Sequence, residues 1–495
     1  MELAPSEPAR LRRLTILLLA LMVGGFVVRN LPWHLDDYDQ AKQAFVSFEM
    51  VEEGQWWFQH TPSGRIATKP PLAGWISAGL YFLFGKSGWE FAWRLPSITA
   101  ALVLIALIFR CGNELAGPRG ALLAACAFGF NLLTPRVAML ARTDMLLTLF
   151  IFVAGWLVFE KVRRAEPWTS RERLWLALAV LGSLLTKGPI LYAFLLPGLA
   201  AYSFVIGRRN EVNYAWAGWL PWFAPLLVFF VWAGIGVAMS REFYQQVVLT
   251  EFLGRFDMGD APVHKHQPLW FYFLQMIHRW APWSVVLLAL ACGRRIRARV
   301  LAEPALLWLA CWALGGLLFM SLVPSKRVDR ILPIIPPLGL LLAGLAEYWI
   351  GLQAARRPRF VMPLIWIGAL GSTGFVIAMV VVSVREDRRG LLRFGQQARE
   401  IARAHPERLA VVAAKEEGLL LYTGRTRFTP VDQAVLGWQR GELDYLVISA
   451  KALRDQEPKL KPLARRLYAR RNSTRQDHYF LIERGQARAD AAPAP

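Results

Sequence analysis

The sequence contains few cysteines and lacks the motifs of several common site types. Its 495 residues include four cysteines, and no two are spaced as CxxC. All four lie in or beside apolar runs, so we interpret them as small buried hydrophobic residues. Neither a disulfide framework nor a zinc site is indicated. Residues 385–485 contain no glycine-rich nucleotide fingerprint and no nucleophile elbow, so neither kind of site is predicted there.

Negative charge is also scarce. The chain has 36 acidic residues against 57 Lys and Arg, a formal net charge of +21. Such a surplus can indicate nucleic-acid binding, but no repeat and no RNP-type segment accompanies it. The basic residues cluster between apolar runs, as they do in the cytoplasmic loops of membrane proteins. We therefore expect membrane lipids as partners and no nucleic acid.

Long apolar runs dominate the chain, which is 55% hydrophobic and has 21 Trp. The runs are about 17–25 residues long, and roughly 20 apolar residues are needed to cross a bilayer. This predicts a mainly α-helical, polytopic membrane protein with about 11–13 transmembrane helices. The first run follows three arginines and precedes no small-x-small cleavage site, so we expect a retained anchor with a cytoplasmic N-terminus.

Eleven spans and one short helix are expected. The run Pro71–Gly85 is too short to span and is interpreted as a membrane-lying or re-entrant helix. The expected spans are Leu14–Val28, Leu95–Phe109, Gly120–Leu140, Met145–Phe159, Leu174–Leu185, Ile190–Ile206, Ala215–Met239, Leu269–Cys292, Pro304–Val323, Ile331–Ile350 and Phe360–Val384. With this parity nearly every arginine cluster is cytoplasmic, as the positive-inside rule requires. The polar loops 31–72 and 240–268 then lie outside.

Two domains and a tail are predicted. Residues 1–384 form the transmembrane domain, which carries both outer loops. After Arg385 an amphipathic helical segment and short strand-like segments alternate, which predicts a small soluble α/β domain over residues 385–485, outside the membrane. The predicted helix is Leu391–Ala404, and the predicted strands are Leu409–Ala414, Tyr445–Ser449 and His478–Ile482. This domain could be a cap or lid without chemistry of its own, and residues 486–495 are expected to be disordered.

Three carboxylates are candidate catalytic groups. Asp36 and Asp37 follow an interfacial Trp33 in the first outer loop. A carboxylate there can deprotonate an acceptor or bind a cation, although a solvated loop start is the alternative. Asp144 lies between two apolar runs, close to membrane depth, where an ionisable group is costly and usually functional. A helix N-cap is the alternative for Asp144.

Cations at span ends on the outer side are candidate phosphate ligands. Lys69 precedes two prolines where the chain enters an apolar run, and Lys187 lies in LTKGP. Lys326, Arg327 and Arg330 form a third cluster. Such side chains can hold a lipid phosphate by charge-assisted hydrogen bonds. The alternative is that they extend to lipid headgroups in general.

The second outer loop contains the pair His264 and His266. Two histidines with a carboxylate could ligate a divalent metal cation. The HxH spacing is common, and surface histidines are the alternative. No other cofactor is expected.

Taken together, these segments resemble those of aminoarabinose-transferase-like enzymes. These enzymes belong to the GT-C glycosyltransferases, beside bacterial relatives of the protein O-mannosyltransferases. Over about residues 10–350 the shared segments occur in the same order: the acidic pair, KPPL, RTDMLLTLF, LTKGP, EFLGRF with HKHQPLWFYF and APW, and PSKR with LPIIPP. The resemblance implies a GT-C fold. It also implies sugar transfer from a polyprenyl-phosphate donor, at the periplasmic face of a bacterial inner membrane.

The resemblance also implies roles for single residues. Asp36 or Asp37 would be the catalytic base, Asp144 the second acidic residue of the site, and Lys69 a contact of the donor phosphate. The further candidates for phosphate binding are Lys187, Arg255, Lys265, Lys326, Arg327 and Arg330. Two departures bear on the metal and phosphate contacts. Thr68 replaces the glutamate of a Glu-Lys-Pro-Pro motif, and Lys-His-Gln-Pro replaces His-Arg-Gln-Pro at residues 265–268.

The chemistry of such a donor agrees with the residues. A lipid phosphate leaving group needs cations to stabilise its charge, and an acceptor hydroxyl needs one base. A single displacement with one base predicts inversion at the anomeric carbon. The sequence leaves the acceptor open among a lipid A-like molecule or other glycolipid, a glycan and a protein. A protein acceptor would make the chain a protein O-glycosyltransferase.

Two other classes of protein fit the sequence less well. A transporter or lipid-binding membrane protein would favour symmetry between the halves and ionisable groups at span centres, and the sequence shows neither. A transferase of phospho-groups would favour a metal site with several Thr, His and Asp ligands, and the sequence offers only HxH.

Overall fold

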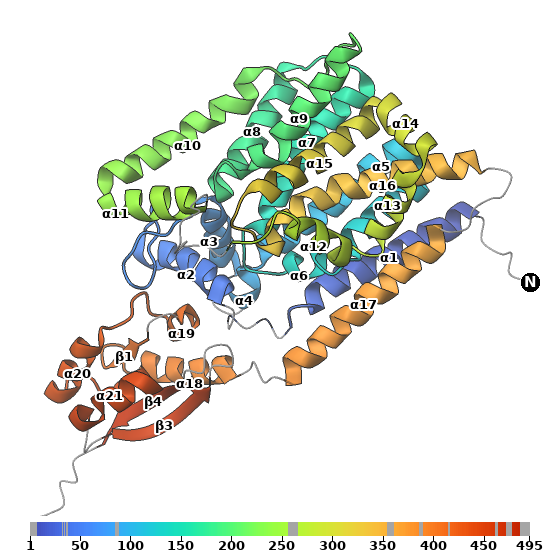
Figure 1. Ribbon diagram of the computed structural model, residues 1–495. Coiled ribbons are helices and arrows are strands. Elements are labelled where there is room, and N and C mark those ends of the chain that lie inside the picture. The colour runs from blue at the N-terminus through green and yellow to red at the C-terminus, as the bar shows by residue number, and fades with distance from the viewer. Residues whose placement is uncertain are drawn as a thin grey trace, which may run out of the picture. The chain divides into compact units, whose positions relative to one another are not determined.

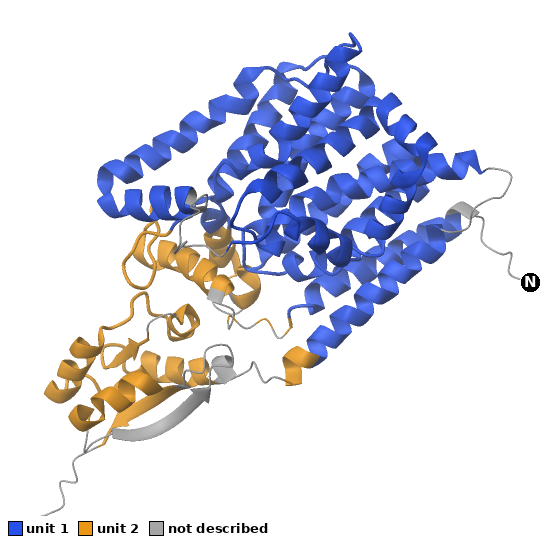
Figure 2. Ribbon diagram, in the orientation of Figure 1, with its two compact units in different colours: residues 1–30, 68–76, 94–381 blue, residues 31–67, 77–93, 382–495 orange. Residues whose placement is uncertain are grey.

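The computed structural model is mainly α-helical, with one small sheet (Figure 1). It describes residues 7–31, 33, 35, 38–84, 89–255, 266–353, 361–385, 390–413, 416–460, 464–471 and 478–485. The chain divides into two compact units (Figure 2). Unit 1 comprises residues 1–30, 68–76 and 94–381, and unit 2 comprises residues 31–67, 77–93 and 382–495.

Unit 1 is built from apolar helices. Its longer helices are α1 (Glu7–Val28), α5 (Leu95–Gly129), α7 (Asp144–Arg164), α8 (Ser170–Lys187), α9 (Ile190–Arg208), α10 (Trp219–Met239), α15 (Pro304–Leu322), α16 (Ile335–Leu352) and most of α17 (Val361–Arg385). Its shorter helices are α6 (Thr134–Ala138), α11 (Arg241–Phe243), η2 (Tyr244–Phe252), η3 (Leu253–Arg255), α12 (Phe271–Arg279), α13 (Trp283–Cys292), α14 (Arg294–Ala302) and η4 (Val328–Ile334). Helix α3 (Leu72–Phe84) begins in this unit.

The chain is a multi-span membrane protein. Within the described ranges, eight helices are long and apolar enough to cross a bilayer, with η4 and α16 counted as one. They account for nine of the expected spans, although α5 contains all of Leu95–Phe109 but only the first half of Gly120–Leu140. The predicted end of that span was wrong, because α5 ends at Gly129 and the short helix α6 begins at Thr134. The expected span Leu174–Leu185 lies in α8, which is not among the eight, and the short apolar helix predicted from residue 71 is α3.

Helix α5 contains a reversal of the chain. Gly117 has a φ of +67°, which breaks the helix, and Pro118 follows it. A Cβ atom on Gly112 would lie 2.9 Å from the Cα atom of Ala121. In a straight helix these two residues would be about 13 Å apart along the axis. The two apolar runs therefore form a tight hairpin, with glycine at the left-handed position that favours it.

The predicted span Leu269–Cys292 is not one helix. It forms the two short helices α12 and α13, which the residues Trp280–Pro282 separate. The proline fixes its own backbone and provides no N–H for a continuous helix. Indole groups hold the break against α5, since Trp280 donates to the carbonyl oxygen of Ala127 at 2.8 Å and Trp283 to that of Phe130 at 2.6 Å. The prediction of a single helix over this run was wrong.

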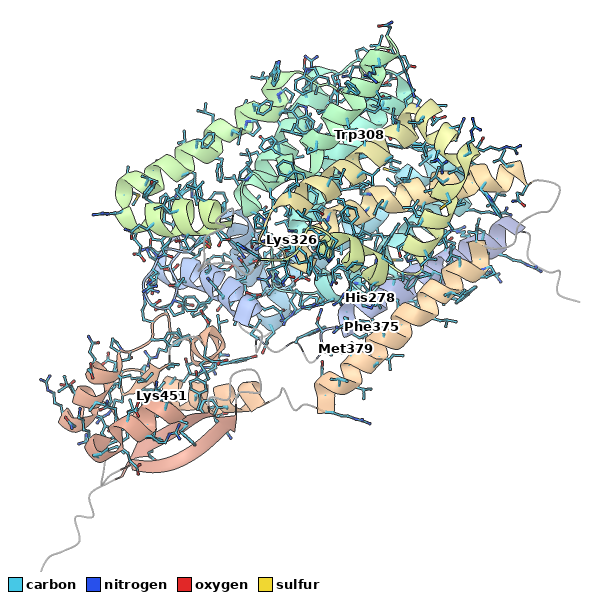
Figure 3. All side chains as sticks on the ribbon, in the orientation of Figure 1. His278, Trp308, Lys326, Phe375, Met379 and Lys451 are labelled. Carbon is cyan, nitrogen blue, oxygen red and sulfur yellow. The ribbon has the colours of Figure 1, made fainter. Side chains whose placement is uncertain are left out.

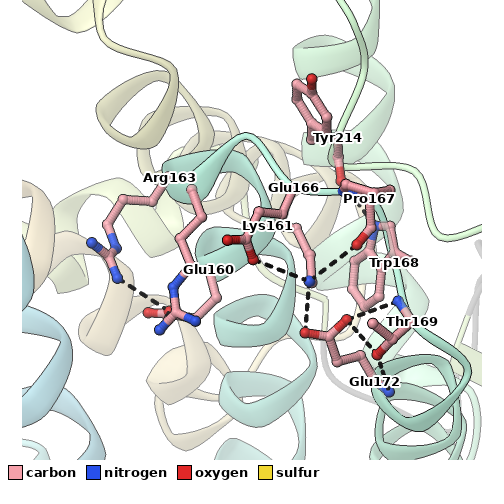
Figure 4. A network of polar contacts seen from close by, with 10 residues as sticks. Glu160, Lys161, Arg163, Glu166, Pro167, Trp168, Thr169, Glu172 and Tyr214 are labelled. Atoms are coloured by element: carbon pink, nitrogen blue, oxygen red, sulfur yellow. Dashed lines mark hydrogen bonds and ion pairs between the residues drawn. The ribbon is translucent and has the colours of Figure 1, made fainter.

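Helix α7 has polar groups at both ends. Its 21 residues give a length of about 30 Å, which matches a bilayer core. Asp144 begins the helix. Near the other end, the Nζ atom of Lys161 lies 2.6 Å from Glu172 Oε1 and donates to the carbonyl oxygen of Pro167 at 3.2 Å (Figure 4). Thr169 and Glu172 form a capping box that starts α8. The basic residues predicted to be cytoplasmic thus fix the α7–α8 turn.

Helices α9 and α15 approach each other through glycines. A Cβ atom on Gly198 would lie 2.7 Å from the Cα atom of Trp312, and one on Gly315 would lie 2.5 Å from the backbone nitrogen of Gly198. Small residues allow close packing of membrane helices, which van der Waals contact stabilises. The buried Trp308, labelled in Figure 3, donates its indole N–H to the carbonyl oxygen of Gly155 at 3.0 Å, which joins α15 to α7.

Unit 2 contains a four-stranded sheet in the order β1–β2–β4–β3. Strands β1 (Leu409–Val412) and β2 (Tyr445–Ser449) are parallel, and β4 (His478–Arg484) is antiparallel to β2 and to β3 (Ala464–Arg471). The helices are α18 (Gly390–Ala404), α19 (Glu417–Thr423), α20 (Val431–Arg440) and α21 (Ala450–Leu460). All three predicted strands and the predicted amphipathic helix are found. Strand β3 was not predicted, because the segment ARRLYARR is rich in arginine and has little apolar alternation.

The first outer loop belongs to unit 2. Residues 31–67 group with the C-terminal region, and α2 (Tyr38–Glu53) packs against α19. The guanidinium of Arg427 lies 2.6 Å from Glu53 and 3.4 Å from Glu49. The short helix α4 (Trp89–Ala92) is also part of this unit. The C-terminal region therefore packs against the first outer loop, and no sequence pattern indicated this.

The contact between α9 and α15 generates a stability prediction. We expect Gly198→Ala to lower the free energy of unfolding by about 1–3 kcal/mol, because the new methyl group has no space. Thermal unfolding of the purified protein in detergent measures the change. Gly234→Ala is the matched control, since nothing lies within 4 Å of a Cβ atom there. The control should be neutral or stabilising, and equal behaviour of the two variants would contradict the packing described.

Candidate active site

A pocket with apolar walls lies in unit 1. Its volume is about 410 Å³, and residues of α9, α10, η2 and α15 line it. The apolar part includes Tyr192, Leu196, Trp232, Phe319 and Met320. Such walls suit a hydrocarbon chain, which gains free energy when it leaves water.

Three cations line the same pocket: Lys69, Lys187 and Arg330. They come from the residues before α3, the last residue of α8 and η4, so distant parts of the sequence supply them. Glu251 of η2 is the carboxylate among the lining residues. An apolar pocket with an excess of positive charge fits an amphipathic anion. The sequence predicted these three cations as phosphate ligands, and the structure brings them together.

The side chain of Lys69 is poised to accept an anion. Within the described part of the chain, no carboxylate lies in ion-pair distance of its ammonium group. Burial, and next the positive charge of Lys187, lower the pKa of Lys69 to about 7. An anionic ligand would reverse this effect, because it favours the charged form.

Arg330 is held in place by the loop before it. Its Nη1 atom donates to the carbonyl oxygen of Ser325 at 2.8 Å and to the hydroxyl of the same residue at 3.2 Å. The guanidinium is thus fixed at the wall of the pocket, with a limited loss of side-chain entropy on binding.

One of the cations that line the pocket, Lys187, belongs to a buried ion-pair network. The Nζ atom of Lys187 lies 2.5 Å from Asp144 Oδ1, and the Nε atom of Arg142 lies 3.2 Å from Asp144 Oδ2. Arg142 also reaches Asp329, with 2.7 Å between Nη1 and Oδ2. Asp144 and Asp329 are only 3% and 5% exposed. Each carboxylate oxygen of Asp144 thus pairs with one cation, so this residue can orient both of them. A direct role of Asp144 in catalysis remains a prediction.

The alternative of an N-cap is not observed for Asp144. The N-cap position of α7 is occupied by Thr143, whose side chain makes no capping hydrogen bond, and Asp144 is the first helical residue. The hydroxyl of Thr148 donates to the carbonyl oxygen of Asp144 at 2.8 Å. The carboxylate of Asp144 therefore does not cap α7, and it forms the ion pairs described above.

Sequence reasoning missed Arg142 and Asp329 as members of the site. Asp329 lies in KRVDR, where one acid stands within a basic cluster at a span end. That pattern indicates an ion pair but does not name the partner, which here is 187 residues away. The Oδ1 atom of Asp329 has no hydrogen-bond partner among the described residues.

Residues 266–267 contact residues 324–326, a segment that leads to Arg330. His266 forms an isolated β-bridge with Ser325, and the N–H of Gln267 donates to the carbonyl oxygen of Pro324 at 3.1 Å. The ammonium of Lys326, labelled in Figure 3, donates to the carbonyl oxygen of Gln267 at 2.9 Å and is buried. Lys326 therefore joins the two segments and does not line the pocket. Arg327 is exposed.

Several predicted site residues lie outside the described ranges. These are Asp36, Asp37, His264 and Lys265, and the side chain of Arg255. Their roles remain predictions. His266 is exposed, and among the residues that are described no three His, Cys, Asp or Glu side chains gather as a metal site.

Comparison with known proteins identifies what this chain is similar to. Residues 68–234 match the family model described as dolichyl-phosphate-mannose-protein mannosyltransferase. This segment contains three residues of the site, Lys69, Asp144 and Lys187. The predicted resemblance to GT-C glycosyltransferases is confirmed.

Curated relatives carry the name undecaprenyl phosphate-alpha-4-amino-4-deoxy-L-arabinose arabinosyl transferase. The protein from Erwinia tasmaniensis is 31% identical over 62% of this chain and 54% of its own length. The protein from Pectobacterium carotovorum is 28% identical over 70% of this chain and 60% of its own length. The chain thus spans somewhat more than half the length of these relatives.

Solved structures share the fold. ArnT from Cupriavidus metallidurans bound to undecaprenyl phosphate superposes with a TM-score of 0.72 at 18% identity, covering 94% of this chain and 97% of that chain. The oligosaccharyltransferase AglB from Archaeoglobus fulgidus gives 0.52 at 12% identity, covering 90% and 70%. The expected GT-C fold is therefore confirmed.

The ion-pair network generates a second stability prediction. We expect Asp144→Asn to lower the free energy of unfolding by about 3–5 kcal/mol, because it leaves Lys187 buried beside a neutral group. Adding Lys187→Gln should recover part of the loss, since the unpaired charge is removed too. Denaturation of the purified protein in detergent measures both effects.

The matched control is the pair of Arg299, which is exposed, and Glu303, which is half-buried; the two side chains lie 2.8 Å apart. Glu303→Gln should cost only about 0–1 kcal/mol. Equal losses at Asp144 and Glu303, or no recovery in the double variant, would contradict the network.

Proposed function

We propose that this protein is a membrane glycosyltransferase. It transfers a sugar from a polyprenyl-phosphate donor to a lipid A-like or other glycolipid acceptor, at the periplasmic face of the bacterial inner membrane. The observation that carries the proposal is the pocket in which Lys69, Lys187 and Arg330 meet apolar walls. The arabinosyl transferase relatives, and the shared fold of a protein that binds undecaprenyl phosphate, support it. Lys161 and the neighbouring basic residues lie at the end of α7 opposite Asp144. The positive-inside rule makes that end cytoplasmic, which supports a periplasmic position for the pocket.

The pocket fits the donor at both of its ends. The phosphate would contact the three cations, which hydrogen-bond to charged oxygens and stabilise the negative charge of the leaving group. The first isoprene units would pack against the apolar walls. Asp144 holds Lys187 in place before the donor binds, so little reorganisation is needed when charge develops on the phosphate.

The base in this proposal comes from the first outer loop. Asp36 or Asp37 accepts the proton of the acceptor hydroxyl, whose oxygen attacks the anomeric carbon. The bond from that carbon to the phosphate oxygen breaks, and its electron pair stays on the phosphate, next to the cations. A single displacement of this kind inverts the anomeric configuration. The position of both aspartates just before α2, and the family resemblance, support this assignment.

A second function is favoured by one observation. The family model that matches residues 68–234 is named for transfer to protein, so a protein O-glycosyltransferase is the alternative within the same chemistry. A divalent cation at His264 and His266 is part of the proposal only as an open addition. His264 lies outside the described residues, and no step is assigned to a metal.

Turnover of the donor tests the proposed base. Purified protein is incubated with polyprenyl-phosphate sugars and either a glycolipid fraction or a peptide, and release of polyprenyl phosphate is measured. One of Asp36→Asn and Asp37→Asn should lower kcat by about 100-fold or more, since a positioned base contributes roughly that much. Asp39→Asn, in the first turn of α2, is the matched control and should keep its activity.

Dependence of release on the glycolipid or on the peptide identifies the acceptor class. Full activity in both loop variants would overturn the assignment of the base. Tight donor binding without turnover of any donor would favour a transporter or lipid-binding protein.

The pH dependence of donor binding tests the role of Lys69. Because its pKa is lowered to about 7 by burial, its charged fraction falls as the pH rises from 6 to 8.5, and affinity for polyprenyl phosphate should fall with it. Arginine stays charged over this range, so Lys69→Arg should flatten the profile. Lys69→Gln should bind roughly 10- to 100-fold more weakly, the loss expected for a hydrogen bond to a charged group.

Ionisation of the phosphate is common to all these proteins, so the ratio of wild type to Lys69→Arg isolates the lysine. Lys42→Gln, in α2, is the control that should not change the affinity. An identical pH profile for wild type and Lys69→Arg would contradict the contact with the phosphate.

A further inference from the structure

Unit 2 contains a cavity that the proposed chemistry does not use. Its volume is about 780 Å³, and it lies at the carboxyl ends of the parallel strands β1 and β2. Val412 ends β1 and Ser449 ends β2, and both residues line the cavity. In open α/β sheets, ligands bind in the crevice outside the carboxyl ends of the parallel strands.

One wall of this crevice comes from the first outer loop, at Pro62–Gly64. The loop forms a tight turn here, in which the N–H of Gly64 donates to the carbonyl oxygen of Thr61 at 2.9 Å, and Gly64 has a φ of +76°. The backbone N–H of Phe428 donates to the carbonyl oxygen of Pro62 at 3.4 Å. The crevice is therefore built jointly by two segments that are far apart in the sequence.

Ion pairs fix this wall to the C-terminal region. Arg427 reaches Glu53 at 2.6 Å and Glu49 at 3.4 Å. The carboxylate of Glu49 is completely buried and also accepts a hydrogen bond from the backbone N–H of His60 at 3.1 Å. Removing Arg427 would take a counter-charge away from the buried carboxylate of Glu49. Arg427 is thus committed to holding the wall, and other residues must provide the contacts to a ligand.

The lining of the crevice has the chemistry of a carbohydrate site. Ser63, Thr429 and Ser449 supply hydroxyl groups, and Lys451 and Asp455 supply one exposed charge of each sign. The Ser449 oxygen accepts a hydrogen bond from the N–H of Ala452 at 3.2 Å, which leaves its own O–H to donate. Phe428 is an aromatic residue in the same lining, and Figure 3 labels Lys451 on this unit.

A sugar ring needs both kinds of contact, because its hydroxyl groups donate and accept hydrogen bonds while its C–H face packs on an aromatic ring. We propose that this crevice binds a saccharide. Resting on the proposed function, the saccharide is the glycan part of the acceptor. The opposite charges of Lys451 and Asp455 balance each other, so the site recognises hydroxyl groups more than a net anion.

This position would couple acceptor binding to the reaction. The segment that supplies the wall at Pro62–Gly64 also contains α2, and α2 begins directly after Asp37. Glu49 and Glu53, near the end of α2, are the residues that Arg427 holds. A single stretch of chain therefore carries both the candidate base and one wall of the saccharide site.

Binding of soluble sugars tests the proposal. The full-length protein in nanodiscs is titrated with a glucosamine disaccharide, with and without a phosphate group, by calorimetry or saturation-transfer NMR. Asp455→Asn and Phe428→Ala should weaken binding at least 5-fold. Asp432→Asn is the matched control, because Asp432 is exposed in the first turn of α20 and does not line the crevice.

Each outcome decides the question. Similar affinity for the two disaccharides, lost in the crevice variants, supports the saccharide site. Binding of only the phosphorylated disaccharide would overturn it in favour of an anion site, and binding that Asp455→Asn does not change would overturn it altogether. Asp455 is exposed, so its variant is expected to fold, and unchanged thermal unfolding checks this.

Kinetics separate this inference from the proposed function. Asp455→Asn should raise KM for the glycolipid acceptor at least 5-fold, with kcat and KM for the donor unchanged. If polyprenyl phosphate fails to bind the pocket at Lys69 while the disaccharide still binds the crevice, the proposed function fails alone. If donor turnover is normal and KM for the acceptor does not respond to Asp455, the saccharide site fails alone.

Discussion

The buried ion pair between Asp144 and Lys187 is the contact on which the candidate site depends. Charges are costly where water is scarce, and they are retained only when each is paired. Asp144 contacts two cations and, through Arg142, connects to Asp329. The network thus links the start of α7, the end of α8 and η4. These are the elements that present Lys187 and Arg330 to the pocket, so the same interaction serves the fold and the candidate chemistry.

The pocket combines two requirements that rarely coexist on a protein surface. Apolar walls favour a hydrocarbon chain, and the cations that line the same pocket favour a phosphate. Lys69 is the sensitive member, because burial lowers its pKa to about 7. A pocket of this kind favours a lipid with an anionic head, because the tail and the head each meet a matching lining, and this agrees with the proposed polyprenyl-phosphate donor.

The composition of unit 2 changes the interpretation of the C-terminal region. From the sequence this region read as a soluble α/β domain that could be a cap without chemistry of its own. The structure shows that it holds the first outer loop through Arg427, Glu49 and Glu53 and shares a cavity with it. The loop that carries the candidate base is therefore held at α2 and at Pro62 by residues of the C-terminal region. A truncated protein would lack that support.

The sequence by itself determined the membrane class, most spans, the cations Lys69, Lys187 and Arg330, and the family resemblance. Apolar length and the positions of charges are local properties, and the bilayer imposes their pattern directly. Only the tertiary structure decided that α5 reverses, that residues 269–292 form two helices, and that Asp144 pairs with Lys187. It alone joined the first outer loop to the C-terminal region. Ion pairs and cavities arise between residues that are distant in the chain, and no local pattern specifies which distant side chain will be the partner.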